Sequence, residues 1–89
     1  MKYRFDFTTR FKKEYRKLSA DEMNDVDKVI QLLLNGKTLP EKCRDHKLAG
    51  DKKSFRDCHV RPDLLLIYKI EEDILVLTAV EIGSHSNLF

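Results

Sequence analysis

Three apolar segments separated by short turns most constrain the fold of this chain. They span residues 54–60, 64–70 and 74–82, and they are joined by residues 61–63 and 71–73, which carry Pro and charged side chains. Connections this short join antiparallel neighbours, so the sequence predicts an antiparallel meander of three strands. The middle segment is almost continuously apolar, which predicts a central strand covered on both faces.

The first half of the chain predicts one strand followed by two helices. Residues 3–8 alternate apolar and polar side chains, which indicates a half-buried strand with Tyr3, Phe5 and Phe7 on its core face. A short helix then begins at Thr8 or Thr9 and carries its apolar side chains at helical spacing.

A second helix is predicted from Ser19 to Leu34. Ser19 and Glu22 stand three residues apart, as in a capping box, and Asn35-Gly36 supplies a stop signal. The two helices therefore form an αα-hairpin. Residues 36–53 read as a long loop.

The 89 residues are enough for one domain, predicted over residues 1–89. The element order βααβββ predicts a two-layer α+β fold, in which the helical hairpin packs on a mainly antiparallel four-stranded sheet. No apolar run approaches the ~18 residues of a membrane span. Two cysteines without a C-x-x-C spacing indicate reduced thiols, so we expect a cytoplasmic protein.

The net charge of +2 conceals a strong pattern. Residues 1–17 have a net charge of +5 and residues 42–61 of +4, whereas residues 18–41 and 62–89 have −3 and −4. Two basic segments that meet on a folded surface would attract a polyanion such as nucleic acid. A solvated surface of mixed charge explains the pattern equally well.

The three histidines all lie in the second half and are flanked by polar residues. In the predicted strand 54–60, Asp57 and His59 share one face, whereas Cys58 points to the other. The histidine spacings match no common metal-binding pattern. Cys58 reads as a buried small side chain rather than a nucleophile. Acid–base catalysis without a metal fits best, since histidine can accept or donate a proton near neutral pH.

RNA cleavage needs this pair of roles. A base removes the 2′-hydroxyl proton, an acid protonates the leaving 5′-oxygen, and cations stabilise the charge that develops on the phosphate. Lys and Arg side chains of residues 42–61 are candidates for the cationic role.

Three blocks of sequence resemble the YafQ family of the RelE/ParE toxin superfamily, from bacterial type II toxin–antitoxin systems. They are residues 44–50 (RDHKLAG), 56–68 (RDCHVRPDLLLIY) and 83–89 (GSHSNLF). The resemblance implies a RelE-like fold and a ribosome-dependent endoribonuclease, an mRNA interferase that cuts mRNA in the A site without a cofactor or metal. It also implies a cognate antitoxin of the DinJ or RelB kind, which blocks the toxin, with operator DNA contacted only through the antitoxin complex.

The resemblance also assigns the site. The matching catalytic residues are His46, His59, Asp63 and His85, and Asp57 and Phe89 match supporting positions. Arg56 and Arg61 are further supporting candidates, as cations that can substitute for the Arg that many family members have at position 81. The predicted RNA-binding residues are Lys12, Lys13, Arg16, Lys17, Lys47, Lys52 and Lys53.

Two other functions remain open. Glu81 stands where many family members have Arg, and Leu64 where many have Trp. These differences favour a RelE-fold module that binds antitoxin or RNA with weakened cleavage. A ParE-like gyrase inhibitor is the third alternative, but acid–base histidines have no obvious use in it.

Overall fold

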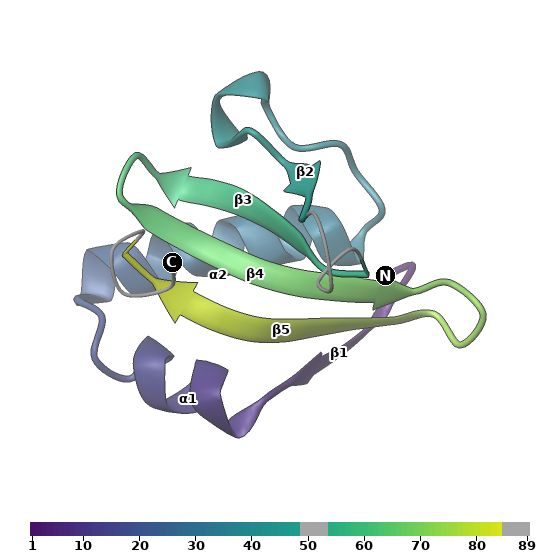
Figure 1. The fold of residues 1–89 in the computed structure, drawn as a ribbon, viewed down its shortest axis with the longest axis horizontal. Coiled ribbons are helices and arrows are strands. Elements are labelled where there is room, and N and C mark those ends of the chain that lie inside the picture. The colour runs from purple at the N-terminus through teal and green to yellow at the C-terminus, as the bar shows by residue number, and fades with distance from the viewer. Residues whose placement is uncertain (49–53, 85–89) are drawn as a thin grey trace.

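The computed structural model describes residues 1–48 and 54–84, which form two helices, one short 3₁₀ turn and one sheet (Figure 1). In chain order the elements are β1 (Arg4–Phe7), α1 (Thr9–Tyr15), α2 (Ala20–Leu34), the 3₁₀ helix η1 (Glu41–Cys43), β2 (His46–Lys47), β3 (Arg56–Arg61), β4 (Leu64–Glu71) and β5 (Val76–Gly83). The predicted α+β class and order of the main elements are confirmed.

The sheet has the strand order β1-β5-β4-β3-β2. The predicted meander β3-β4-β5 is antiparallel, and β1 joins its β5 edge in parallel. The predicted number of four strands is wrong, since a fifth strand, β2, pairs antiparallel with β3. β2 is only two residues long and lies inside the predicted loop 36–53, where no alternating pattern marks it.

Side-chain caps define the helix ends. Thr8 Oγ1 accepts the Phe11 N–H at 3.0 Å at the start of α1. Ser19 and Glu22 form the predicted capping box of α2, each side chain accepting the other's backbone N–H, at 3.1 and 2.9 Å. Gly36 follows α2 with φ +70°, a conformation that side chains disfavour, so the predicted stop signal is confirmed.

The two faces of the sheet are covered differently. α2 lies behind the sheet in Figure 1 and buries the main core against it, including Cys58, Leu66 and Tyr68. On the opposite face, Leu65 and Ile67 are buried at 1% and 2% exposure beneath a small cluster completed by Leu48, Phe55 and Val80. The predicted two-sided burial of the central strand is therefore observed.

The N-terminal strand differs in part from its prediction. Tyr3 is buried in the core, but Phe7 is 46% exposed. β1 is an edge strand, and the Phe7 ring lies beside the rings of Phe5 and Phe11, with ring centroids at 5.8 and 6.4 Å. These aromatic side chains line an apolar hollow of about 510 Å³ between β1, α1 and α2. Neither α1 nor α2 has the length and apolar character needed to cross a bilayer.

We predict that Ser19→Ala lowers the free energy of unfolding by about 1 kcal/mol, because the first turn of α2 loses its N-cap acceptor. Urea unfolding followed by circular dichroism measures the change. Ser54→Ala, at an exposed position outside any helix, is the control and should leave the midpoint unchanged. Equal midpoints for both variants would contradict a stabilising role for the cap.

Candidate functional site

His46 and Asp57 form the centre of the candidate site. β2 and β3 place them opposite each other as cross-strand partners. His46 Nδ1 lies 3.0 Å from Asp57 Oδ1, and the His46 side chain is 56% exposed whereas that of Asp57 is 6% exposed. An accessible imidazole thus stands over a buried carboxylate.

The partners of His46 fix which ring nitrogen carries the proton. Nδ1 lies 2.7 Å from the carbonyl oxygen of Arg44, which can only accept a hydrogen bond. We therefore assign the proton of the neutral ring to Nδ1, which leaves the lone pair on Nε2. A neutral His46 can accept a substrate proton at Nε2, and Asp57 lies where its negative charge stabilises the imidazolium that forms.

The buried carboxylate of Asp57 does not have all of its hydrogen-bonding capacity filled. Its Oδ1 has no aligned hydrogen-bond donor in residues 1–48 and 54–84, because the Nδ1 hydrogen of His46 is directed at Arg44. Burying a carboxylate in this way costs free energy, so its position calls for an explanation other than stability. Its attraction for a charged His46 provides one.

His59 lies two residues further along β3, on the same face as Asp57, as predicted. Its Nδ1 is 3.3 Å from the Pro62 carbonyl oxygen. His59 lines a hollow of about 510 Å³ whose other walls include Lys42, Arg44 and Arg61. Asp25 also lines the hollow and pairs with Arg61, so the imidazole lies beside two cations, Lys42 and Arg44, that have no such partner among the ion pairs of the described residues.

The other predicted site residues are more dispersed. Arg61 is held by Asp25 of α2, with Nε 2.7 Å from Oδ2. Asp63 lies in the β3–β4 turn and lines a different hollow, with Lys17 and Ser84 among its walls. His85, Phe89, Lys52 and Lys53 lie outside the described residues.

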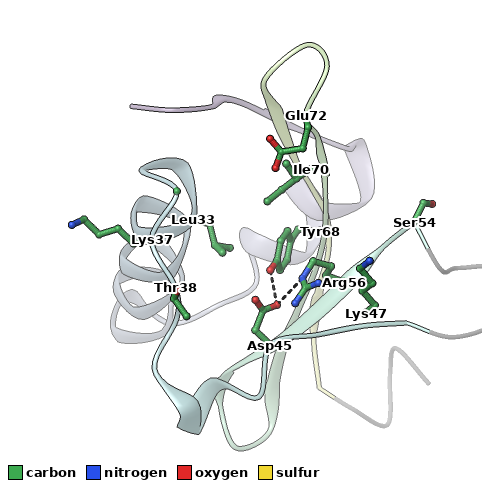
Figure 2. A pocket seen from close by; sticks show the side chains of 11 residues that line it. Leu33, Lys37, Thr38, Asp45, Lys47, Ser54, Arg56, Tyr68, Ile70 and Glu72 are labelled. Atoms are coloured by element: carbon green, nitrogen blue, oxygen red, sulfur yellow. Dashed lines mark hydrogen bonds and ion pairs between the residues drawn. The ribbon is translucent and has the colours of Figure 1, made fainter.

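Arg56 faces away from His46 and Asp57. Its Nε donates to Asp45 Oδ1 at 3.2 Å, and Tyr68 Oη donates to the same oxygen at 2.5 Å (Figure 2). These three residues line a hollow of about 680 Å³ next to the C-terminal end of α2. Arg56 is thus engaged on the helix-covered face of the sheet, where Tyr68 belongs to the main core.

The predicted basic surface on α1 is accessible. Its four members are all exposed, two on α1 and two directly after it: Lys12, Lys13, Arg16 and Lys17. Lys47 on β2 is exposed as well. Arg10, also on α1, forms an ion pair with Glu81 of β5, with Nη1 2.9 Å from Oε1. The negative charge at Glu81 is thereby compensated by a cation from α1.

The sequence identifies Arg44 and Lys42 only as members of the cationic segment 42–61 and does not reveal their individual roles. Arg44 supplies the carbonyl that orients His46, and it adopts the left-handed conformation, φ 48°, at the end of η1. Lys42 adds a cation to the His59 hollow. Both lie close to His46 in the sequence, but nothing in the pattern predicts the tight turn of η1 that brings them there.

The described residues do not supply a metal site or a reactive thiol. Residues 1–48 and 54–84 contain no group of three or more His, Cys, Asp or Glu side chains that could hold a metal ion. Cys58 is fully buried, and this burial raises the pKa of its thiol, with a further contribution from Asp45. The interpretation of Cys58 as a packing residue agrees with both observations.

The fold and the site together define a small toxin of the type II toxin–antitoxin class. Residues 3–89 match the family described as "Bacterial toxin of type II toxin-antitoxin system, YafQ". The chain belongs to this family, as the sequence blocks predicted.

Similar proteins extend the comparison. The mRNA interferase toxin YafQ of Escherichia coli K12 is 39% identical over 69 residues, which are 76% of this chain and 73% of that protein. The crystal structure of the E. coli DinJ–YafQ toxin–antitoxin complex matches with a TM-score of 0.86 and 30% identity, over 100% of this chain and 99% of that one. A metal-bound toxin from Helicobacter pylori matches with a TM-score of 0.83 and 34% identity, over 98% and 99%.

We predict that neither thiol reacts with Ellman's reagent in the folded protein, since Cys43 and Cys58 are 5% and 0% exposed and burial raises the pKa of Cys58. Both thiols should react after unfolding in guanidinium, which serves as the control. Rapid reaction of Cys58 in the folded protein, located by mass spectrometry of the labelled chain, would contradict its assignment as a packing residue.

Proposed function

We propose that this toxin is an mRNA interferase, a ribosome-dependent endoribonuclease that cuts mRNA in the A site by acid–base catalysis without a metal. The names of its curated relatives support the enzyme class. The observation that carries the proposal is the exposed His46 ring, oriented by Arg44 and backed by the buried Asp57.

His46 is the proposed general base. Its Nε2 takes the proton from the 2′-hydroxyl of the nucleotide to be cut, and the 2′-oxygen then attacks the adjacent phosphorus. The Asp57 carboxylate, 3.0 Å from Nδ1, stabilises the imidazolium during this step. Attack at phosphorus displaces the 5′-oxygen of the next nucleotide, so that oxygen needs a proton from an acid.

The remaining roles are proposed from position and resemblance. The His59 ring nitrogen Nδ1 faces the Pro62 carbonyl, so an imidazolium at His59 carries a second proton on Nε2 that it can give to the leaving 5′-oxygen. Lys42 and Arg44 beside it are suited to the phosphate charge. The resemblance assigns proton transfer also to Asp63 and His85, and base stacking to Phe89. Positioning by the ribosome supplies the alignment that so small an open site lacks.

A protein partner is the second part of the proposal. The E. coli relative is found in a complex with the antitoxin DinJ, and we infer a cognate DinJ-like antitoxin for this chain. The apolar hollow that contains Phe7 supports this inference, because Phe7 and Met1 are 46% and 82% exposed. Operator DNA would be contacted through that complex, and the ribosomal target implies a cytoplasmic protein.

The ion pair between Arg10 and Glu81 bears on the alternative of weakened cleavage. The Glu81 side chain is 14% exposed and pairs with Arg10, whose Nε also lies 3.7 Å from Glu14 Oε1. The ion pair offsets part of the negative charge of Glu81 and so weakens the main argument for the non-catalytic binding module.

We predict that His46→Ala slows cleavage by about 100- to 10,000-fold, the range for loss of a general base. Asp57→Asn should slow it by a smaller factor, because the amide cannot stabilise the imidazolium by charge. Primer extension on mRNA from a purified translation system, with and without ribosomes, measures the cuts. Asp73→Asn, at an exposed turn carboxylate, is the matched control for Asp57→Asn.

Two results would contradict this function. Cleavage by folded His46→Ala at the rate of the unaltered protein would remove His46 from the chemistry. An absence of cuts by the unaltered protein with ribosomes present would favour the binding module, and DNA damage on expression would favour the gyrase inhibitor.

We predict that replacing Lys12, Lys13, Arg16 and Lys17 by Gln weakens ribosome binding and flattens its dependence on salt, because fewer counterions are released from rRNA. Sedimentation with ribosomes across a series of salt concentrations gives the slope. Lys28→Gln, at an exposed position of α2, should leave it unchanged. An unaltered slope in the fourfold variant would exclude α1 from rRNA contact.

A further inference from the structure

A partly buried hydrogen-bond cluster lies on the opposite face of the sheet from His46. It consists of Asp45, Arg56 and Tyr68, and Figure 2 shows both donors converging on one Asp45 oxygen. Tyr68 is 1% exposed and comes from the central strand β4, and Arg56 comes from β3. Asp45 is therefore tied to the two strands that form the rigid middle of the sheet.

Asp45 directly precedes His46, and the segment that carries both is otherwise attached through the buried Cys43 before it and the Leu48 side chain after it. β2 is two residues long and lies at the edge of the sheet. Pairing with β3 involves His46 and Lys47, followed by one backbone hydrogen bond from Leu48 N to Phe55 O at 3.0 Å. An edge segment this short gains little stability from backbone pairing alone.

The position of His46 depends on this segment. Its Nδ1 must stay near both Arg44 O and Asp57 Oδ1, and Arg44 lies one residue before Asp45. A shift of the backbone at Asp45 would move both the ring and the carbonyl that orients it. The anchor on one face of the sheet thus fixes the geometry on the other.

We propose that Tyr68 and Arg56 are positioning residues for the RNA-cleavage reaction. Through their hydrogen bonds to Asp45 they hold the His46 ring where it can accept the substrate proton and keep its own proton on Nδ1. This inference rests on the proposed function. It gives Arg56 a role different from that of the substitute phosphate-binding cation expected from the sequence, because its guanidinium Nε is engaged by Asp45.

The chemistry of the cluster suits a fixed anchor. Burial raises the pKa of Tyr68, and its bond to Asp45 raises it further, so the hydroxyl remains a donor at every pH at which the protein works. The hydrogen bond to a carboxylate is charge-assisted and stronger than one between neutral groups. Arg56 supplies the positive charge that a half-buried carboxylate requires.

The chain offers a matched control for removing a buried tyrosine hydroxyl. Tyr3 is 5% exposed and donates from Oη to Glu72 Oε1 at 2.6 Å. Tyr3→Phe and Tyr68→Phe therefore remove the same kind of bond. Glu72 lies in the β4–β5 turn, whereas Asp45 directly precedes His46. A purely structural role for Tyr68 predicts similar behaviour of the two variants.

The experiment compares Tyr68→Phe, Asp45→Ala and their double variant with Tyr3→Phe in the full chain. Ribosome-dependent cleavage gives the rate and ribosome sedimentation the affinity. Urea unfolding gives the stability, and ¹H–¹⁵N spectra of the imidazole nitrogens report the tautomer of His46, assigned by its absence in His46→Ala. Asp45→Asn, which keeps an acceptor oxygen, tests rescue.

We expect Tyr68→Phe to slow cleavage by about 10- to 100-fold at unchanged ribosome affinity, because a displaced base is poorly aligned. Tyr3→Phe should retain the normal rate. The double variant should be no slower than Asp45→Ala alone, since Tyr68 acts through Asp45. Asp45→Asn should recover most of the lost rate, and Tyr68→Phe should lose the Nδ1–H signature of His46.

Equal rates for Tyr68→Phe and Tyr3→Phe, or an unchanged His46 tautomer in Tyr68→Phe, would overturn the proposal. If Tyr68→Phe fails to fold, a normal rate and tautomer in Asp45→Ala would overturn it. If His46→Ala cleaves normally, the proposed function fails instead, and the nitrogen spectra still decide whether the cluster positions His46.

Discussion

Burial of the central strand on both faces is the constraint on which the rest of the structure depends. Leu64 to Tyr68 are all 5% exposed or less, so each face of β4 needs its own cover. α2 supplies one, and the small cluster with Leu48 and Phe55 supplies the other. Leu48 belongs to the segment that carries His46, and so the demand for apolar cover also draws the candidate base toward Asp57.

The elements with strong local signals were predictable from the sequence. The capping box at Ser19, the stop at Gly36 and the two-sided apolar run of β4 each act over a few residues, and each is found as predicted. β2 was not predictable, because two polar residues form a strand only where β3 is already present to pair with them. The exposure of Phe7 escaped prediction for a similar reason, since strand alternation does not reveal that β1 lies at the sheet edge.

The candidate site likewise has features that the local sequence predicts and features that depend on distant segments. The common face of Asp57 and His59 follows from the period of a strand, and the structure has it. The pairing of His46 with Asp57 depends on the register of β2, and the turn at Arg44 depends on a left-handed residue that is not Gly. The engagement of Arg56 by Asp45 and of Glu81 by Arg10 also joins distant segments. Charge patterns show which side chains are cations, but they do not show which cations are already neutralised.

The parallel pairing of β1 with β5 has a kinetic consequence. Arg4–Phe7 aligns with Val76–Ala79, so the first strand finds its partner only after most of the chain has been made. Contacts so distant in sequence form late and slow the folding of small domains. During synthesis the aromatic side chains of β1 and α1 stay without the cover of β5, because β5 is the last strand to be made. The sheet edge formed by β1 can therefore be completed only when synthesis of the chain is nearly finished.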